Sequence, residues 1–303
     1  MEGNQGLFVG LTTLDCLYQA AHPPTADEKV VANKSLLVSG GPATNAAVAF
    51  AQLGGSKGNA ATLASAIGTH PIASLLREDL QTYGVTIADL TPARSQPPPI
   101  SSIVVTKETG ERAVVASNAV EMQVAAEDVS ADILDSVNVV LIDGHQMAIG
   151  AQVAQWAKEK HIPVVVDAGS WKEGFNHVLS QADVVIASAH FFPPECRTPK
   201  EVFSYLQTSG VSKIAITRGG QSILYRENGA DGEIEVPSIR AVDTLGAGDI
   251  FHGAFCHFHL SHTFEEALLK ASRSASFACQ YWGTRDWTNI YKMTDKMTDD
   301  EEE

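Results

Sequence analysis

The sequence predicts an α/β fold built on a central, mostly parallel β-sheet with helices on both faces. The first observation is a set of short, continuously apolar runs, which are typical of strands buried on both faces. These runs are Asn138 to Asp143, Pro163 to Asp167, Asp183 to Ala187 and Lys213 to Thr217. The second observation is the helical composition of Ala148 to Lys160, which gives a strand, helix, strand order along the chain.

Two regions depart from this order and predict a small antiparallel β-sheet, the lid, over one end of the main sheet. They cover about 16–38 and about 97–118. Within the second region, Ile100 to Ser117 alternates in hydrophobicity around a Glu-Thr-Gly turn, as a β-hairpin does, and it follows three prolines. No internal repeat or long linker is visible, so we expect one main domain with an inserted lid.

Chain length and composition predict a globular protein with a large core. The 303 residues are 44% hydrophobic, which fits one large α/β domain. The four cysteines lie far apart without a CxxC pair, which argues against a disulfide framework and against a zinc knuckle. They are Cys16, Cys196, Cys256 and Cys279.

Charge and the chain ends exclude several classes of partner. The net charge is −15, from 36 acidic and 21 basic residues, which argues against nucleic-acid binding. The N-terminus shows no targeting pattern, and no window approaches the roughly 18 apolar residues of a membrane span, so we expect a cytoplasmic protein without a membrane partner. The acidic stretch 295–303 is expected to be a solvated, disordered tail.

The stretch VDTLGAGDIFHGAF combines small residues with an acid at the start of a predicted helix. Gly246, Ala247 and Gly248 can present backbone N–H groups to an anion, because a helix N-terminus carries a partial positive charge. Asp249 follows at once and is placed to take a proton from an attacking hydroxyl group. The structural alternative is an acid that only stabilises the helix N-terminus.

A second glycine pair opens the stretch SGGPATNAAVAFAQLGG. Gly40 and Gly41 permit close backbone approach, and Asn45 lies in the first turn of a predicted helix, where a polyhydroxy ligand can hydrogen-bond. A tight strand-to-helix turn is the structural alternative. Neither a Walker loop nor a GxGxxG motif is present.

Together, VDTLGAGD and GGPATNAAVAFAQLG resemble the two signatures of the ribokinase-like (PfkB) carbohydrate kinases. VGLTTLD near the start, the lid segments and TRGG after the strand at Lys213 follow in family order, so the resemblance covers nearly the whole chain. The pattern is most similar to the ketohexokinase and sulfofructose kinase branches. It implies a kinase domain over 1–294.

The resemblance implies a mechanism in which Asp249 deprotonates a sugar hydroxyl that attacks the γ-phosphate of ATP. Gly246, Ala247 and Gly248 would then form the anion hole for the transferred group. The implied cofactors are ATP and Mg²⁺, with K⁺ as a further candidate, because Asp243 matches an acid that helps to organise a monovalent cation in many relatives. A loop-capping role is the alternative for Asp243.

The resemblance also implies residues that bind the sugar. Thr13 and Asp15, in VGLTTLD, lie where the family binds sugar hydroxyls, with Gly41 and Asn45 on the other side of the sugar. Arg112 matches a lid arginine of the ketohexokinase pattern, and its alternative is a solvated hairpin charge. His145, after a predicted strand end, is a candidate for substrate or phosphate contact together with Asp143.

On the nucleotide side, Thr217 and Gly219 match a loop that borders the nucleotide, and Ser272 lies on the helix that usually flanks adenine. The chain departs from the family where an Asn-x-x-Glu motif organises water around magnesium, since it has Ser188 and Phe191 there. Magnesium is still expected, bound to the phosphates of ATP. His252, Cys256 and His259 share one helix face, but we expect core packing there rather than a metal site.

The predicted function is ATP-dependent phosphorylation of a free sugar hydroxyl, with a ketose or related polyol favoured as substrate. A nucleoside kinase is one alternative, with Tyr18, Phe191 and Phe192 as candidates for stacking on a base. The other alternative is a catalytically weak regulator that binds sugar or nucleotide. A homodimer through the lid is a further expectation, because the lid is expected to have exposed edges and an apolar underside that can pair with a second lid.

Overall fold

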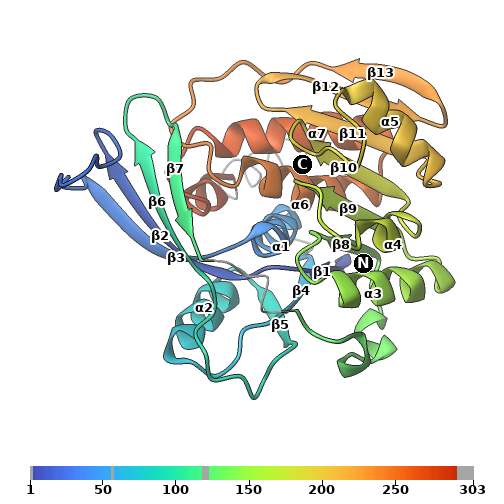
Figure 1. The fold of residues 1–303 in the computed structure, drawn as a ribbon, viewed down its shortest axis with the longest axis horizontal. Helices are drawn as coiled ribbons and strands as arrows, with labels where there is room; N and C mark the ends of the chain where they lie inside the picture. The colour runs from blue at the N-terminus through green and yellow to red at the C-terminus, as the bar shows by residue number, and fades with distance from the viewer. Residues whose placement is uncertain (1–2, 56–57, 118–122, 292–303) are drawn as a thin grey trace, which may run out of the picture.

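The structure is a computed structural model, and it describes residues 3–55, 58–117 and 123–291. Within these residues, a sheet of nine strands runs through the molecule in the order β13-β12-β11-β10-β9-β8-β1-β4-β5 (Figure 1). The strands are β1 (Gln5–Val9), β4 (Ala60–Ser65), β5 (Val85–Asp89), β8 (Val139–Ile142), β9 (Val164–Ala168), β10 (Val184–Ser188), β11 (Lys213–Arg218), β12 (Gln221–Glu227) and β13 (Ala230–Ile234).

Seven neighbouring strands of this sheet, from β5 to β11, are parallel, and β12 and β13 add an antiparallel edge. The four apolar runs in the sequence form β8, β9, β10 and β11, so the prediction of a mostly parallel sheet is confirmed. Every residue of β8 and of β9 is buried, because helices cover both faces of the sheet.

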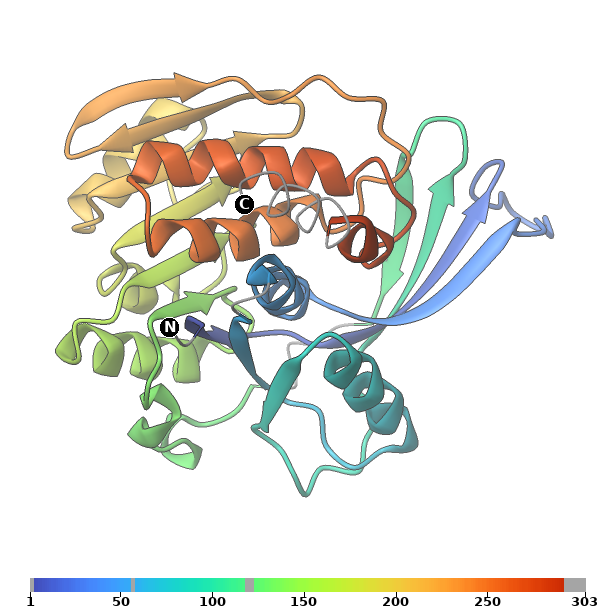
Figure 2. The same cartoon turned by 180° about the vertical axis from the view of Figure 1, so that it is seen from behind.

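Helices from opposite ends of the chain cover one face of the main sheet, and helices from the middle of the chain cover the other (Figures 1 and 2). The first group is α1 (Pro42–Leu53), α6 (Ala247–His259) and α7 (Phe264–Ala278). The second group is α3 (Met147–Glu159), α4 (Phe175–Leu179) and α5 (Pro199–Thr208). Alternate strand residues enter the two layers: Val165 packs in the core of the first group, and Val164 and Val166 pack in that of the second.

The remaining helices of the described residues are one α-helix and two short 3-10 helices. Helix α2 (Pro71–Thr82) packs against β3 and β5, and two short 3-10 helices, η3 (Ala126–Asp128) and η4 (Ala131–Leu134), precede β8. No helix in the described ranges is long and apolar enough to cross a membrane. The predicted acidic tail, 295–303, lies outside the described residues.

A second sheet, of four strands, belongs to the described residues, and Figures 1 and 2 show that it projects from one end of the main sheet. Its strands, in the order β3-β2-β6-β7, are β2 (Thr13–Ala20), β3 (Lys34–Gly40), β6 (Ile100–Thr106) and β7 (Arg112–Ala116). The β2–β3 and β6–β7 pairs are antiparallel, as predicted, and the two pairs join through parallel pairing of β2 with β6. Its underside forms an apolar cluster in which Leu17 and Ile103 pack with Trp282 and Leu245 from the C-terminal part of the chain.

Candidate active site

The candidate site lies at the carboxyl ends of the parallel strands, where α/β sheets commonly bind ligands. Helix α6 begins there, and Gly246 precedes its first residue in the left-handed conformation with φ of 70°. A side chain at this position would be strained and would also approach Thr284 to 2.8 Å. Glycine is therefore required for the sharp turn that aims the start of α6 into the site.

Asp249, in the first turn of α6, has a strongly perturbed carboxyl group. Burial and the neighbouring charge of Asp167 raise its pKa from 3.8 to about 7, although a hydrogen bond from Asn45 and the nearby His252 oppose this rise. The Asn45 Nδ2 group donates to Asp249 Oδ2 over 2.8 Å. A carboxyl group that titrates near neutral pH is well matched to the work of a general base.

The predicted anion hole lies at the same turn. The first N–H groups of a helix have no acceptor within the helix, so they can turn to a ligand. Gly248 is exposed, and a methyl group built on it would meet no atom within 4 Å, which leaves open space over this part of the backbone. The N–H of Ala247 instead donates to the Thr244 carbonyl over 3.3 Å.

A buried charge pair that sequence reasoning missed lies beneath the start of α6. The His252 ring places Nδ1 2.7 Å from the Gly248 carbonyl oxygen and Nε2 3.2 Å from that of Ile186. Carbonyl oxygens only accept hydrogen bonds, so each ring nitrogen can bond to its carbonyl only as a donor. Asp167 Oδ2 lies 3.5 Å from Nδ1, within ion-pair distance of the ring in its protonated form.

His252 is thus committed to hydrogen bonds within the protein. His259, on the same helix, stacks on Phe255 with a centroid distance of 4.9 Å, and Cys256 is fully buried. Among the described residues, no group of three or more metal-binding side chains is found.

The predicted sugar side is built on the glycine pair that ends β3. Thr13 donates a hydrogen bond of 2.6 Å to Asp15, and burial raises the pKa of Asp15. A methyl group at Gly40 would come within 1.9 Å of the Asp15 carboxylate, and one at Gly41, whose φ is 100°, within 2.3 Å of the Leu11 carbonyl oxygen. The two glycines therefore make room for the Asp15 carboxylate and the Leu11 carbonyl. We had expected them to make room for a ligand.

Asn45 is held on both sides by protein groups. While its Nδ2 group donates to Asp249, its Oδ1 atom accepts a 2.9 Å hydrogen bond from Nη1 of Arg285. Arg285 is buried, and sequence reasoning did not find it, because a single arginine in the stretch GTRDW carries no motif. One N–H of the Asn45 amide is left for a ligand.

A cavity of about 460 Å³ opens on the predicted nucleotide side, at the ends of β10 and β11. Thr217 and Gly219 lie in its wall, and so does Ser188 from the segment that departs from the family motif. Ser272 is buried on α7 and donates to the carbonyl of Leu269 in its own helix over 2.9 Å, so its hydroxyl is directed to the backbone.

The sequence also matches a family model described as pfkB family carbohydrate kinase, over residues 7–289. The chain belongs to the pfkB family of carbohydrate kinases. It is therefore a phosphotransferase by family, and the resemblance of its two glycine-rich signatures is confirmed.

Individual relatives of this kinase are 17% to 25% identical to it in sequence. Mouse ketohexokinase is 25% identical over 94% of this chain and 97% of its own length, and ribokinase of Bacillus subtilis is 23% identical over 91% and 93%. Giardia lamblia ribokinase superposes with a TM-score of 0.78 at 17% identity, over 96% of this chain and 99% of that chain. Arabidopsis thaliana ribokinase, solved with ribose and ATP, superposes with 0.73 at 20% identity, over 93% and 94%. These two superpositions show the shared fold.

Arg112 of the kinase reaches from the small sheet to the loop before α6. Its Nη1 atom lies 3.2 Å from the Thr244 carbonyl oxygen and 3.3 Å from the Thr244 hydroxyl, which in turn donates to the Gly110 carbonyl over 3.4 Å. Asp243 in the same loop is buried and accepts backbone N–H bonds from Leu245 and Gly283 over 2.9 and 3.0 Å. These bonds match the loop-capping alternative for Asp243.

Asp143 also holds backbone in place. Its Oδ2 atom accepts N–H bonds from Leu11 and Ala43, at 2.9 and 3.0 Å, and its Oδ1 atom accepts one from His145 at 2.9 Å. A methyl group at Gly10 would overlap this carboxylate. Asp143 therefore fastens the ends of β1 and β8 to the start of α1, and the side chain of His145 stays a candidate for ligand contact.

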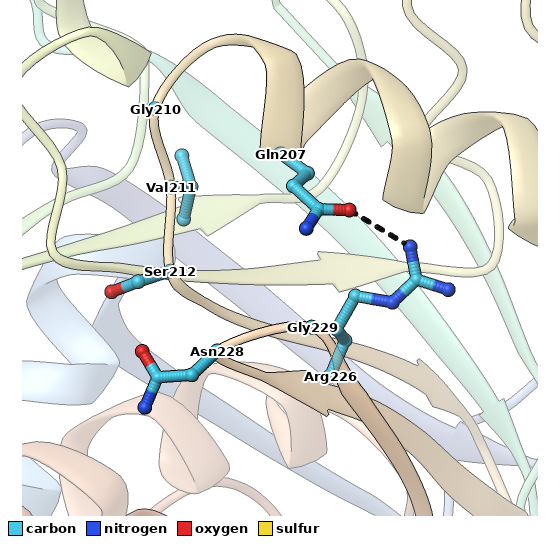
Figure 3. A pocket seen from close by; sticks show the side chains of 7 residues that line it. All are labelled: Gln207, Gly210, Val211, Ser212, Arg226, Asn228 and Gly229. Atoms are coloured by element: carbon cyan, nitrogen blue, oxygen red, sulfur yellow. Dashed lines mark hydrogen bonds between the residues drawn. The ribbon is translucent and has the colours of Figure 1, made fainter.

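A smaller cavity of about 200 Å³ lies at the opposite edge of the main sheet, before β11 (Figure 3). Its one charged side chain, Arg226, is bound to Gln207 over 3.2 Å and to Asp231 over 2.5 Å. With its charge neutralised inside the protein, this cavity offers no chemistry of the kind found at the start of α6.

Proposed function

We propose that this kinase transfers the γ-phosphoryl group of ATP to a hydroxyl group of a free, uncharged sugar or polyol, with Asp249 as the general base. The observation that carries the proposal is the position of Asp249, which combines a pKa of about 7 with the first turn of a helix. A hydroxyl group at Asp249 Oδ would lose its proton as it attacks, while N–H groups of the same turn neutralise the charge of the transferred phosphoryl group.

The charges around the sugar side support an uncharged substrate. Asp15 and Asp249 are acidic, and the cation near both of them, Arg285, is buried and bound to Asn45 and Ser39. A phosphate or sulfonate group on the sugar would therefore meet carboxylates rather than a free basic cluster. Hydroxyl groups suit these acceptors, and among neutral sugars we favour a ketose or a related polyol.

The aromatic candidates for binding a nucleobase give little support to a nucleoside substrate. Phe191 is 1% exposed and packs edge-on against Phe175, with a centroid distance of 5.5 Å. Tyr18 alternates along β2 with Leu17, whose side chain packs beneath the small sheet, so Tyr18 is on the opposite face. Phe192 and Tyr18 are both 40% exposed, so Phe192 is the one exposed candidate that does not lie on the outer face of the small sheet.

The nucleotide would lie in the cavity that contains Thr217 and Gly219. Among the residues that the structure describes, the wall of this cavity contains no acidic side chain, so Mg²⁺ would be held by the nucleotide phosphates. When bound, the ion would neutralise phosphate charge during transfer. The structure of a candidate ribokinase II from Escherichia coli, with a TM-score of 0.78 at 17% identity, was solved with ATP and Mg²⁺.

Two further proposals concern assembly and monovalent ions. The outer face of the small sheet exposes Leu37 and Val115, at 59% and 77%, which supports pairing with a second copy of the lid. Light scattering at micromolar concentration should then give the mass of a dimer. A requirement for K⁺ would show as a loss of turnover when Na⁺ replaces it.

The test is a coupled ADP-release screen with ATP and Mg²⁺ over ketoses, aldoses, sulfosugars, phosphosugars and nucleosides. Turnover with a neutral sugar that disappears in Asp249→Asn, but persists in the matched surface variant Asp231→Asn, supports the proposal. Turnover that is confined to nucleosides or phosphosugars would contradict the substrate class. Calorimetric binding of sugar or ATP without turnover would instead support the regulator.

A further inference from the structure

We propose that Arg285 is a positioning residue for the general base and that it acts through the side-chain amide of Asn45. The inference rests on the proposed role of Asp249. Two hydrogen bonds in series connect these groups: Arg285 Nη1 to Asn45 Oδ1 over 2.9 Å, and Asn45 Nδ2 to Asp249 Oδ2 over 2.8 Å.

The chemistry of the three groups fixes the direction of this series. A guanidinium group only donates hydrogen bonds and a carboxylate only accepts them, whereas an amide has one face for each. Arg285 therefore holds the oxygen of Asn45 and leaves its N–H group directed at Asp249. A rotated amide would place its N–H group against Arg285 and its oxygen against the carboxylate, which loses both bonds.

The guanidinium group is itself held by contacts that do not involve Asn45. Its Nη2 atom donates to the Ser39 carbonyl over 2.7 Å and lies 3.7 Å from Asp79 Oδ2. Its Cζ atom lies over the Tyr83 ring, 5.4 Å from the ring centroid. With 3% of its surface exposed, Arg285 is a rigid anchor, and it connects the C-terminal part of the chain to the strand end that leads from the lid into α1.

The position of Asn45 matters because few groups oppose the factors that raise the pKa of Asp249. Burial raises this pKa, and so do the charges of Asp167 on β9 and Asp143 at the end of β8, whereas the Asn45 hydrogen bond and His252 on α6 lower it. By holding Asn45, Arg285 favours the ionised base at neutral pH. Loss of the anchor should therefore leave Asp249 protonated up to a higher pH.

The test compares Arg285→Lys and Arg285→Gln with Asp79→Asn as a matched control. Lysine keeps the buried positive charge but lacks the forked geometry that reaches Asn45 and Ser39 together. Asp79→Asn perturbs the other side of the guanidinium and leaves the Nη1 bond to Asn45 in place. The first readout is the titration of the Asp249 carboxyl carbon by ¹³C NMR in the full chain without substrate, assigned by its absence in Asp249→Asn.

We expect both Arg285 variants to raise the titration midpoint of Asp249 by about one pH unit, as the loss of one hydrogen bond to a charged acceptor implies. In the Asn45→Ala background, Arg285→Lys, which keeps the positive charge near Asp249, should not raise the midpoint further. A wild-type midpoint in Arg285→Lys would overturn the proposal, because the positive charge alone would then explain the effect of Arg285 on Asp249. An equal rise in Asp79→Asn, or full additivity with Asn45→Ala, would also overturn it.

The second readout is the pH profile of kcat/KM, which reports groups of the free enzyme, so its acidic limb should move upward with the NMR midpoint. At neutral pH, kcat/KM should fall by about fivefold in both Arg285 variants, because a midpoint that moves from about 7 to about 8 leaves about a tenth rather than about a half of Asp249 ionised. If the wild-type protein phosphorylates nothing, the proposed function fails, and the NMR titration still decides the role of Arg285.

Discussion

Replacing Asp249 by asparagine should stabilise the protein at neutral and alkaline pH while it abolishes phosphoryl transfer. Burial and Asp167 raise the pKa of this carboxyl group from 3.8 to about 7, whereas the unfolded chain releases the same proton near 3.8. Between these pH values the folded state binds one proton more than the unfolded state, so the free energy of unfolding falls as the pH rises. At about 1.4 kcal/mol for each pH unit, the loss reaches about 4 kcal/mol by about pH 8.

Asparagine is a suitable replacement because its oxygen can still accept the N–H of Asn45, so only the charge is removed. Urea denaturation of both proteins between about pH 4 and about pH 8 measures the effect. The free energies of unfolding should agree at the acidic end and diverge by up to about 4 kcal/mol at the alkaline end. The exposed control Asp231→Asn should show no such gain. A difference between wild type and Asp249→Asn that stays constant with pH would refute the reasoning.

Three further predictions concern the surroundings of this base. Gly41→Ala should lower the free energy of unfolding by about 2 kcal/mol or more in urea denaturation, because φ is 100° and a backbone oxygen lies 2.3 Å from the added methyl group. Gly84→Ala, with φ of 74° but open space, should cost only about 1 kcal/mol. His252→Gln removes a charge that lowers the pKa of Asp249, so the acidic limb of kcat should move to higher pH; an unmoved limb would contradict the charge pair. Arg112→Ala should raise KM for the sugar about threefold to tenfold, measured by steady-state kinetics, with little change in stability.

Much of the fold could be predicted because it follows from patterns that are local in the sequence. The runs that became β8 and β9 are continuously apolar, since every residue of these strands is buried. The hairpin of β6 and β7 was visible from its alternation and its Glu-Thr-Gly turn. The parallel pairing of β2 with β6 was not visible, because it joins segments about 80 residues apart without a turn between them.

The site could be predicted only where the functional groups lie close together in one segment of the sequence. GAGD indicated both the helix start and the proposed base, because four consecutive residues contain the N-cap glycine and Asp249. The connection from Arg285 through Asn45 to Asp249 spans 240 and 204 positions of sequence, so only the tertiary structure brings the three together. Asp167 gave a weaker signal that was overlooked, since polar residues at the carboxyl ends of buried parallel strands often face a ligand site.

The most direct measurement of the central claim is ³¹P NMR of the protein with ATP, Mg²⁺ and the neutral sugar that the ADP-release screen selects, followed beside Asp249→Asn. The account predicts that a sugar phosphate ester grows as ATP is consumed by the wild-type protein and that Asp249→Asn forms it at least about a thousandfold more slowly. Release of inorganic phosphate without an ester, or an ester formed at a similar rate by Asp249→Asn, would contradict the claim that Asp249 is the base of a sugar kinase.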